Sequence, residues 1–409
     1  MQKVRVLDIQ SRVPYPLHDG GALGMHIVTT MLAHHPSIEY GAVAMNTSRH
    51  WVKPDAIKHV YGSIPHWWAR VDNRITLPGV TSNLVSGKPY HITRFFDRGF
   101  AQTLRTAIDA FEPHVILLEG LPLVQYAETI RSMCDAAIAY HAHNVEHCIW
   151  QRLVESESHI LRRLYLAEQV RRLKSYELNV FRTSLLDAII TFTRTDAEHI
   201  RRFGFTGTLH VKPFAIDIEQ YTPYYAPETV PTLFHIGSLQ WQPNRDGIEW
   251  FVTDVMPRIR EKFPSVEFHV AGSIPGGYTL SGGNTIVHGV VPDAQQFMQT
   301  HSILVVPLRA GSGVRVKIIE AMALGKAIVS TSIGAEGIEC EPGKEILIAD
   351  TAEDFARCVC QLLTHRDVVE MLGRNARRYA ELHHDLRTVG GHLARFLTRI
   401  AHRQPLDTP

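Results

Sequence analysis

The sequence has few cysteines, no long apolar run and almost no net charge. Its five cysteines form neither a disulfide framework nor a metal-ligand spacing, so we expect reduced and buried thiols. No run of about 18 apolar residues is present, which argues against a transmembrane helix. The formal net charge of +1 gives no reason to expect a general attraction to nucleic acid.

Signals for export and for metal binding are also missing. The first apolar strand follows a short charged start, without the longer apolar core and cleavage site of a signal peptide, so a cytoplasmic location is expected. The 24 histidines are scattered without the spacing of a zinc site, and no acidic triplet stands out. The sequence therefore predicts no metal site. With 409 residues and 45% hydrophobic content, two ordinary domains are expected.

One stretch in the C-terminal half combines strand, glycine turn, helix and strand. Residues 303–307 are apolar and typical of a strand, residues 309–313 form a turn, and residues 314–324 have helical spacing that ends at Gly325. Residues 327–331 then predict the next buried parallel strand. Ligands of open parallel sheets bind at the carboxyl ends of strands, where such turns lie. This stretch is therefore a predicted ligand site.

Three charged side chains lie on the predicted helix of this stretch. Arg315 and Lys317 occupy its first turn, where the helix dipole disfavours cations by about a few tenths of a kcal/mol. A bound anion would reverse that cost, and free N–H groups after the glycines would help to hold a diphosphate. Glu320 shares a mostly apolar face and needs a partner. The alternative is a surface pair between Lys317 and Glu320, worth about 0.2–0.5 kcal/mol.

The sequence of residues 311–325, GSGVRVKIIEAMALG, resembles the donor-site motif of retaining GT-B glycosyltransferases, and family four is the nearest group. Those enzymes usually carry two glutamates in this motif, the first contacting the donor hexose and the second the nucleotide ribose. Glu320 matches the second, whereas Ser312 stands at the first. The pattern is similar to a bacterial branch with a small residue there and a basic pair before the glutamate. This implies that Ser312 and backbone N–H groups replace the first carboxylate.

The resemblance implies a donor site assembled from several loops. Arg315 and Lys317 would neutralise the leaving diphosphate, taking over from an Arg and a Lys that many relatives carry near Ser238 and Asn244. The turn that contains Val290 would read the base through its backbone. The residues implied in donor binding are Gly20, Gly21, Gly237, Ser238, Asn244, Val290, Ser312, Gly313, Val314, Arg315, Lys317 and Glu320, and those implied in catalysis are His143, Arg315, Lys317 and Glu320.

The N-terminal half repeats the order of strand, glycine loop and helix. Gly20 and Gly21 resemble the family's first glycine pair, although an ordinary turn explains two glycines equally well. Farther along, residues 136–141 predict a strand, and His143 follows its carboxyl end. In related enzymes a histidine at this strand end approaches the donor sugar and phosphate. A capping or core histidine is the alternative.

Residues 50–100 are less regular and rich in aromatic and basic side chains. By resemblance this part would face the acceptor, and its surface could bind a glycan by stacking or contact a membrane headgroup layer. The aromatic side chains could equally belong to the core. The residues concerned are Trp51, Trp67, Trp68, Arg70, Arg74, His91, Arg94, Phe95, Phe96 and Arg98.

Strand and helix patterns alternate along nearly the whole chain, and the proline-containing segment 221–232 predicts a linker. The resemblance implies an α/β protein of the GT-B fold, with two Rossmann-like domains facing across a cleft. The predicted acceptor-side domain spans residues 1–220 and is completed by residues 386–409, because the final helix would cross back to it. The predicted donor-binding domain spans residues 229–385.

The function implied is transfer of a hexose from a nucleotide sugar to a glycan or lipid-linked acceptor, with retention of configuration. UDP is the commonest base in the family, and bacterial surface polysaccharide or glycolipid synthesis is the commonest setting. The leaving phosphate would accept the acceptor's proton, so no metal or other cofactor is required. Peripheral contact with the inner membrane surface fits this setting, and no nucleic-acid partner is expected. The alternatives are a sugar-nucleotide epimerase of the same fold and, because of Ser312, an inactive nucleotide-sugar-binding partner subunit.

Overall fold

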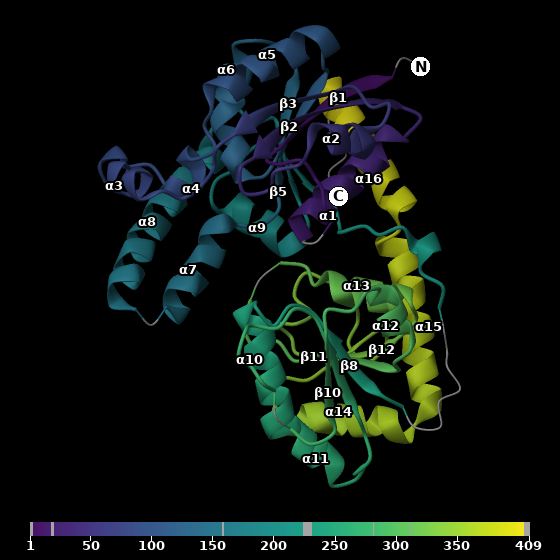
Figure 1. The fold of residues 1–409 in the computed structure, drawn as a ribbon. Helices are drawn as coiled ribbons and strands as arrows, with labels where there is room; N and C mark the ends of the chain where they lie inside the picture. Colours follow the sequence, from purple (N-terminus) through teal and green to yellow (C-terminus); the bar gives the residue numbers. More distant parts are fainter. Residues whose placement is uncertain are drawn as a thin grey trace. The chain divides into compact units, whose positions relative to one another are not determined.

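The computed structural model contains two α/β domains, each built on its own parallel sheet (Figure 1). The first domain comprises residues 1–213 together with residues 389–409, and the second comprises residues 214–388. The chain therefore leaves the first domain, builds the second and returns. The residues that the structure describes are 3–17, 20–157, 159–223, 231–280, 282–311 and 313–404.

The sheet of the first domain has seven parallel strands in the order β3-β2-β1-β4-β5-β6-β7. Its central strands are nearly continuous apolar runs because helices cover both faces of a parallel sheet. β4, with the sequence VILLE, is buried along its whole length. The strands are β1 (Val4–Gln10), β2 (Ile38–Thr47), β3 (His66–Val71), β4 (Val115–Glu119), β5 (Ala137–Ala142), β6 (Ala188–Thr191) and β7 (Thr208–Val211).

The helices of the first domain include the last helix of the chain. On α16, Gly390 lies beside Met31 of α1, and Phe396 stacks on His210 at a ring distance of 4.3 Å. The predicted return of the C-terminal helix to the first domain is thereby confirmed. The helices are α1 (Gly20–Ala33), α2 (Pro54–Tyr61), α3 (Leu77–Ser86), α4 (Tyr90–Thr93), α5 (Arg98–Phe111), a 3₁₀ turn (Leu121–Tyr126), α6 (Ala127–Arg131), α7 (Glu146–Ser156), α8 (Ile160–Arg182), α9 (Arg194–Arg202) and α16 (Leu386–Ala401).

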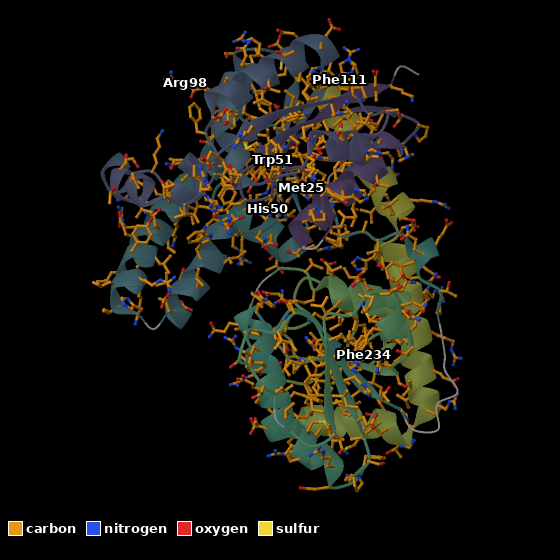
Figure 2. All side chains as sticks on the ribbon, viewed as in Figure 1. Met25, His50, Trp51, Arg98, Phe111 and Phe234 are labelled. Carbon is orange, nitrogen blue, oxygen red and sulfur yellow. The ribbon has the colours of Figure 1, made fainter. Side chains whose placement is uncertain are left out.

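The sheet of the second domain has six parallel strands in the order β10-β9-β8-β11-β12-β13. One face packs against α10, α11 and α14 in a core that includes Phe251, Phe268 and Phe355. Phe234, labelled in Figure 2, contacts Phe297 of α12 instead, at a ring distance of 6.1 Å. The strands are β8 (Leu233–Ile236), β9 (Phe268–Ala271), β10 (Thr285–Gly289), β11 (Ile303–Val306), β12 (Ala327–Ser330) and β13 (Leu347–Ile348).

Helices of the second domain follow most of its strands, but no helix lies between β9 and β10 or between β12 and β13 in the described part of the chain. α13 ends at Ala323, and Gly325, two residues later, has a φ of 68°, the left-handed conformation that glycine adopts without strain. None of the helices in the described part of the chain is long and apolar enough to cross a membrane. The helices are a 3₁₀ turn (Ile218–Gln220), α10 (Gln242–Trp250), a π-helical turn (Phe251–Val255), α11 (Met256–Arg260), α12 (Ala294–Gln299), α13 (Val316–Ala323), α14 (Ala352–Thr364) and α15 (Arg366–His383).

Several elements differ from the sequence predictions. The irregular stretch 50–100 contains α2, β3, α3 and α4, and the ten-residue strand β2 precedes it unpredicted. Gly41 interrupts the apolar pattern of β2, and a Cβ there would make a tight contact of 3.1 Å with the ring of Phe111. α10 begins at Gln242, since Pro243 fits the first turn of a helix. Asn244 is therefore on a helix and not in a loop.

Candidate active site

The ammonium group of Lys317 lies at the carboxyl end of β8. Its Nζ donates to Nε2 of His235 at 2.9 Å and to Oδ1 of Asn244 at 3.2 Å. Asn244 is held in turn, because its amide group donates to the carbonyl of Ser238 at 2.9 Å. An ammonium has three N–H donors, so two have partners among the described residues and the third is left for a ligand.

His235 can only be the acceptor of the hydrogen bond that Lys317 donates. Its Nδ1 donates to the carbonyl of Val305 at 2.8 Å, and a carbonyl cannot donate in return. Burial and the charge of Lys317 hold the pKa of His235 well below its usual value, so the ring is neutral. Burial, and then the neighbouring Arg315, lower the pKa of Lys317 to about 7. The partners of Lys317 are thus neutral, and its charge is not cancelled by them.

Gly237 makes room for this ammonium. A Cβ at this position would lie 2.6 Å from Nζ of Lys317 and 2.8 Å from Nδ2 of Asn244. Its φ of 155° also lies outside the range that other residues adopt readily. Gly272 plays a similar part, because a Cβ there would lie 2.0 Å from the carbonyl oxygen of Gly237. The loops after β8 and β9 therefore approach each other through glycine.

Arg315 was predicted in the first turn of the helix, but it lies at the N-cap position, one residue before α13 begins. Its guanidinium donates to the carbonyls of Gly313 and, at 3.5 Å, Ile333, and it lies 5.6 Å from the ring centre of Trp241. Gly313 has a φ of 84°, which a residue with a side chain would adopt only with strain. The turn thus wraps around a buried guanidinium at the positive end of the helix.

Glu320 lies one helical turn after Lys317 and accepts a hydrogen bond from the hydroxyl of Tyr221 at 3.0 Å. Burial raises the pKa of Glu320, although Tyr221 and Lys317 oppose the rise. Burial and the carboxylate likewise raise the pKa of Tyr221. The surface pair between Glu320 and Lys317 was the structural alternative, but the hydrogen bonds described here join these two residues to Tyr221, His235 and Asn244 instead.

The other residues of the second domain that were predicted to bind the donor have fewer contacts with Lys317, Arg315 and Glu320. Ser238 follows Gly237 and its hydroxyl pairs with that of Ser273 at 2.6 Å. Val314 lies between Gly313 and Arg315, and Val290 lies in the turn after β10 with 76% of its surface exposed. Ser312 lies outside the described residues. The predicted residues that the second domain groups with partners are therefore Lys317, Arg315, Glu320, Gly237, Ser238 and Asn244.

His143 belongs to a second polar cluster, in the first domain. Its Nε2 donates to Oε2 of Glu119 at 2.6 Å, while Nδ1 of His141 lies 2.9 Å from the same oxygen. Glu119 ends β4 and is fully buried, and His141 lies on the neighbouring strand β5 at the paired position. Glu119 therefore fixes which nitrogen of His143 carries the proton and leaves Nδ1 as the nitrogen for a ligand.

Charges around Glu119 are mutually compensating. Burial alone would raise the pKa of Glu119, but His141 and His143 together lower it below its usual value. Burial lowers the pKa of His141 to about 4, against the attraction of Glu119. Burial also lowers the pKa of Lys212 to about 8, and its Nζ lies 4.6 Å from the ring centre of Phe192. The carboxylate thus sits among basic groups whose charged forms it favours.

Gly20 and Gly21 are not in a loop as predicted. They form the first turn of α1, and a Cβ at Gly20 would meet nothing within 4 Å. Glycine destabilises a helix mainly in its middle, so the first turn tolerates it. Space is free beside Gly20, and a role of this glycine in the close approach of a ligand stays a prediction.

The aromatic and basic stretch, residues 50–100, divides between core and surface. Trp67 packs against the core, whereas Trp51, labelled in Figure 2, and Phe96 are exposed by 46% and 54%. A pocket of about 450 Å³ opens beside Phe96. The core interpretation is therefore confirmed for Trp67, whereas contact of the exposed side chains with a glycan or a membrane stays a prediction. The pocket is lined by Asp72, Arg74, Thr76, Gly79, Ser82, Asn83, Ser86, Tyr90, Thr93, Arg94 and Phe96.

Four residues that hold the predicted ones were not predicted. They are Glu119, Tyr221, His235 and Trp241. Glu119 and His235 carried a usable signal, because each is a polar residue at or near the carboxyl end of an otherwise apolar strand. Tyr221 and Trp241 had no comparable signal. All five cysteines, expected to be buried, are partly exposed and free.

Comparison with known families gives a match to the second domain. Residues 230–365 match the sequence model of the family described as Glycosyl transferases group 1. A curated relative, an uncharacterised 44.6 kDa protein from the cps region of Klebsiella pneumoniae, is 22% identical over 261 residues. The match takes in 60% of this chain, and the chain spans 65% of the length of that relative.

Solved structures resemble the whole chain. Sucrose-phosphate synthase from Thermosynechococcus elongatus has a TM-score of 0.71 at 12% identity, covering 98% of this chain and 100% of its own. HepE from Anabaena, in complex with UDP, has a TM-score of 0.66 at 14% identity, covering 97% and 100%. A trehalose-6-phosphate protein from E. coli, bound to UDP-2-fluoro glucose, has a TM-score of 0.61 at 12% identity, covering 97% and 99%. The chain therefore has the GT-B fold, and its second domain matches the glycosyl transferases group 1 family.

Proposed function

We propose that the protein is a retaining hexosyltransferase that uses a nucleotide sugar as donor. Support for transfer chemistry comes from the family match of residues 230–365 and from the GT-B fold. The donor would bind in the second domain, at the carboxyl ends of its strands. The acceptor would be a glycan or a lipid-linked sugar.

The observation that carries this proposal is the neutral environment of Lys317. Its ammonium is held by His235 and Asn244, neither of which cancels its charge. The nearby Arg315 and the N-terminus of α13 add positive potential at the same strand ends. A diphosphate would supply the missing negative charge and accept the remaining N–H of the ammonium. Stabilisation of a leaving diphosphate is the task that transfer from a nucleotide sugar requires.

The carboxylate of Glu320 suits the ribose of the same nucleotide. It already accepts one hydroxyl, that of Tyr221, and a carboxylate has further lone pairs for sugar hydroxyls. Because burial raises its pKa, hydrogen bonds from a ribose would stabilise the ionised form. Glu320 would therefore gain by binding a diol.

The chemical step would need no protein nucleophile. In the mechanism proposed here the leaving phosphate accepts the acceptor's proton, the bond from the sugar to the phosphate breaks, and the new glycosidic bond forms on the same face. Arg315, Lys317 and the start of α13 would supply the positive charge, so the transfer itself would require no metal. His143, held by Glu119, would contact the donor sugar through its free Nδ1.

A UDP-sugar is the proposed donor, because HepE from Anabaena binds UDP-glucose and has the same fold. Synthesis of a surface polysaccharide or glycolipid in the bacterial cytoplasm is the proposed setting. The exposed Trp51 and Phe96 and the arginines nearby would then contact the acceptor or the headgroups of the inner membrane surface.

Nucleotide release from UDP-, GDP- and ADP-sugars by the full chain, without added metal, tests the proposal. We expect release from one base class, and we expect Glu320→Ala to reduce it by about tenfold to a hundredfold, because a ribose contact strengthens donor and transition-state binding alike. Glu341→Ala is the matched control, since Glu341 is an exposed glutamate of the same domain that pairs with Lys344.

The outcomes separate the proposal from its rival. Release that depends on Glu320 supports the transferase. Binding of UDP that raises the melting temperature without any release, even when sugar acceptors are added, would favour the inactive partner subunit, for which the small residue Ser312 is the argument. If no nucleotide sugar released its nucleotide and no nucleotide raised the melting temperature, the donor site itself would be contradicted.

A further inference from the structure

Three histidines from separate segments meet in the second domain. His269 lies in β9, His288 lies in β10, and His301 follows α12. One ring nitrogen of each lies within 4.8 Å of those of the other two. Their spacing along the sequence gave no sign of this, because the sheet topology alone brings the three segments together.

The local backbone aims these rings at one another. The pairing of β9 and β10 shifts register between Val287 and Gly289, so His288 is the extra residue of a bulge. Bulges commonly redirect a side chain next to a functional site. The ring of His301 lies 4.3 Å from that of His269 and 4.5 Å from that of Phe297 on α12. The cluster is thus walled by an aromatic ring on the helix side.

In His269 and His301, the ring nitrogen that would not bind the metal already has the kind of partner that metal-ligating histidines use. Nε2 of His269 lies 3.2 Å from the carboxylate of Glu267, and Nδ1 of His301 donates to the carbonyl of Phe297 at 2.7 Å. A ligating histidine almost always gives its second N–H to a carboxylate or a carbonyl in this way. These contacts leave Nδ1 of His269 and Nε2 of His301 as the nitrogens with lone pairs for the cluster.

His288 completes the set. Its Nε2 lies 3.0 Å from Nδ1 of His269, close to the separation of about 3.3 Å that two ligands 2.0–2.1 Å from a tetrahedral zinc ion would have.

We propose that His269, His288 and His301 bind one divalent cation of the borderline class, for which Zn²⁺ is the best fit, with water completing its coordination. When the ion enters, the proton that Nε2 of His288 shares with His269 moves to Nδ1 of His288, and both facing nitrogens donate their lone pairs to the metal. Glu267 contributes a negative charge that favours the cation, whereas Lys326, whose charge reaches His301, opposes it.

The site would act on the edge of the sheet. β10 is the outermost strand, and the turn that contains Val290 follows directly after His288. A metal joining β10 to β9 and to the end of α12 would hold the start of that turn in place. The inference does not depend on the proposed function, because it concerns binding of a cation and not turnover of a sugar nucleotide.

Zinc binding by the full chain, first stripped with a chelator and then dialysed, tests the site. In a competition titration with a chromophoric chelator, we expect one Zn²⁺ per chain to be lost when His288 is replaced, with affinity at least about a hundredfold weaker in His288→Gln. His288 is exposed, so this change should leave the fold intact. We expect Glu267→Gln to weaken binding by about tenfold, because it removes only the partner of His269.

His383→Gln is the matched control, since His383 is an exposed histidine of the same domain outside the cluster. It should bind Zn²⁺ as the unaltered protein does. Co²⁺ provides a second measurement, because a tetrahedral site with nitrogen ligands gives visible absorption bands, which His288→Gln should abolish. Equal zinc affinity of His288→Gln and the unaltered protein, or absence of both zinc binding and Co²⁺ bands at micromolar metal, would overturn the proposal.

Discussion

His143 in the first domain and Lys317 in the second domain both lie at the carboxyl ends of parallel strands, but they differ in their partners. His143 and His141 share the carboxylate of Glu119 at 2.6 and 2.9 Å. Lys317 instead donates to the neutral His235 and to an amide oxygen. In the first cluster, the charge of Glu119 is balanced by the two histidines, and the carboxylate holds the ring of His143 in position. In the second cluster, the charge of Lys317 is left for a ligand. Anion binding should therefore depend more on Lys317 than on His143.

The largest expected effect is that of Lys317→Met. We expect turnover to fall by about 10²–10³, as removal of a charge-stabilising donor does in other enzymes. The melting temperature of the free protein should rise, because an ammonium that is costly to bury has been removed. Turnover assays and thermal unfolding measure the two effects. Lys344→Met, at an exposed lysine paired with Glu341, is the control and should change neither.

If Lys317→Met kept its turnover, the contrast between the two clusters would be broken. Lower turnover together with a lower melting temperature would also count against it, because that result would mean that Lys317 supports the fold. Only opposite changes in the two quantities fit a charge retained for a ligand.

The next effect in size is a pH dependence of UDP binding. Since the pKa of Lys317 in the free protein is about 7, the ammonium loses its proton above that pH, and binding of a diphosphate must restore it. The dissociation constant should therefore rise by up to about tenfold per pH unit above pH 7. Calorimetric titration at pH 7, 8 and 9 measures it, and Lys317→Met should remove the dependence.

The stability of the free protein should show the opposite trend in the same interval. The usual pKa of lysine, 10.5, applies to the unfolded chain, so between about pH 7 and 10.5 the unfolded state binds more protons than the folded state. The contribution of Lys317 to the free energy of unfolding therefore rises with pH across this interval. A flat contribution, seen as identical pH profiles of the unaltered protein and Lys317→Met, would show that the ammonium is not buried at a cost.

The smallest expected effect is that of Glu119→Gln. His143 would lose its ionised partner, and turnover should fall by about tenfold because the ring is less well positioned. The affinity for UDP should stay the same, since the nucleotide would be held by the second domain. The free energy of unfolding should fall by about 1.5–3 kcal/mol, the value of hydrogen bonds to a charged group. Steady-state kinetics, UDP titration and chemical unfolding measure the three quantities.

Glu128→Gln, at an exposed position on α6 of the same domain, is the control for this change. If Glu119→Gln weakened UDP binding as much as turnover, the difference in role between the Glu119 cluster and the Lys317 cluster would be contradicted. It would fail equally if turnover were unaffected while stability fell, because the cluster would then be a structural feature of the core alone.

The sequence pattern was sufficient to predict the strand, turn and helix around Lys317, but not to predict the residues that hydrogen-bond to it. The strand at 303–306, the glycine turn and α13 follow from an apolar run, two glycines and helical spacing, all of them local signals. His143 could be placed at a strand end for the same reason. His235 and Tyr221 are distant in sequence from Lys317 and Glu320, so only the folded sheet decides which side chains meet.

Glycine was the least informative local signal. At Gly237 and Gly313 it marks a turn with an unusual φ or a crowded side chain, as predicted for a binding loop. At Gly20 and Gly21 the same residue type begins a helix. In β2, Gly41 lies against the ring of Phe111, and because it interrupts the apolar pattern this strand was not predicted. The reason for each glycine lies in a neighbour that the sequence does not identify.

The return of α16 to the first domain has a consequence for synthesis of the protein. The second domain is one continuous segment, so it can fold as soon as it leaves the ribosome, whereas the first must wait for residues beyond 388. At about 5–20 residues per second, synthesis of residues 214–388 takes on the order of ten to 35 seconds. During that time the surface of α1 around Met31 lacks the cover that α16 gives it through Gly390.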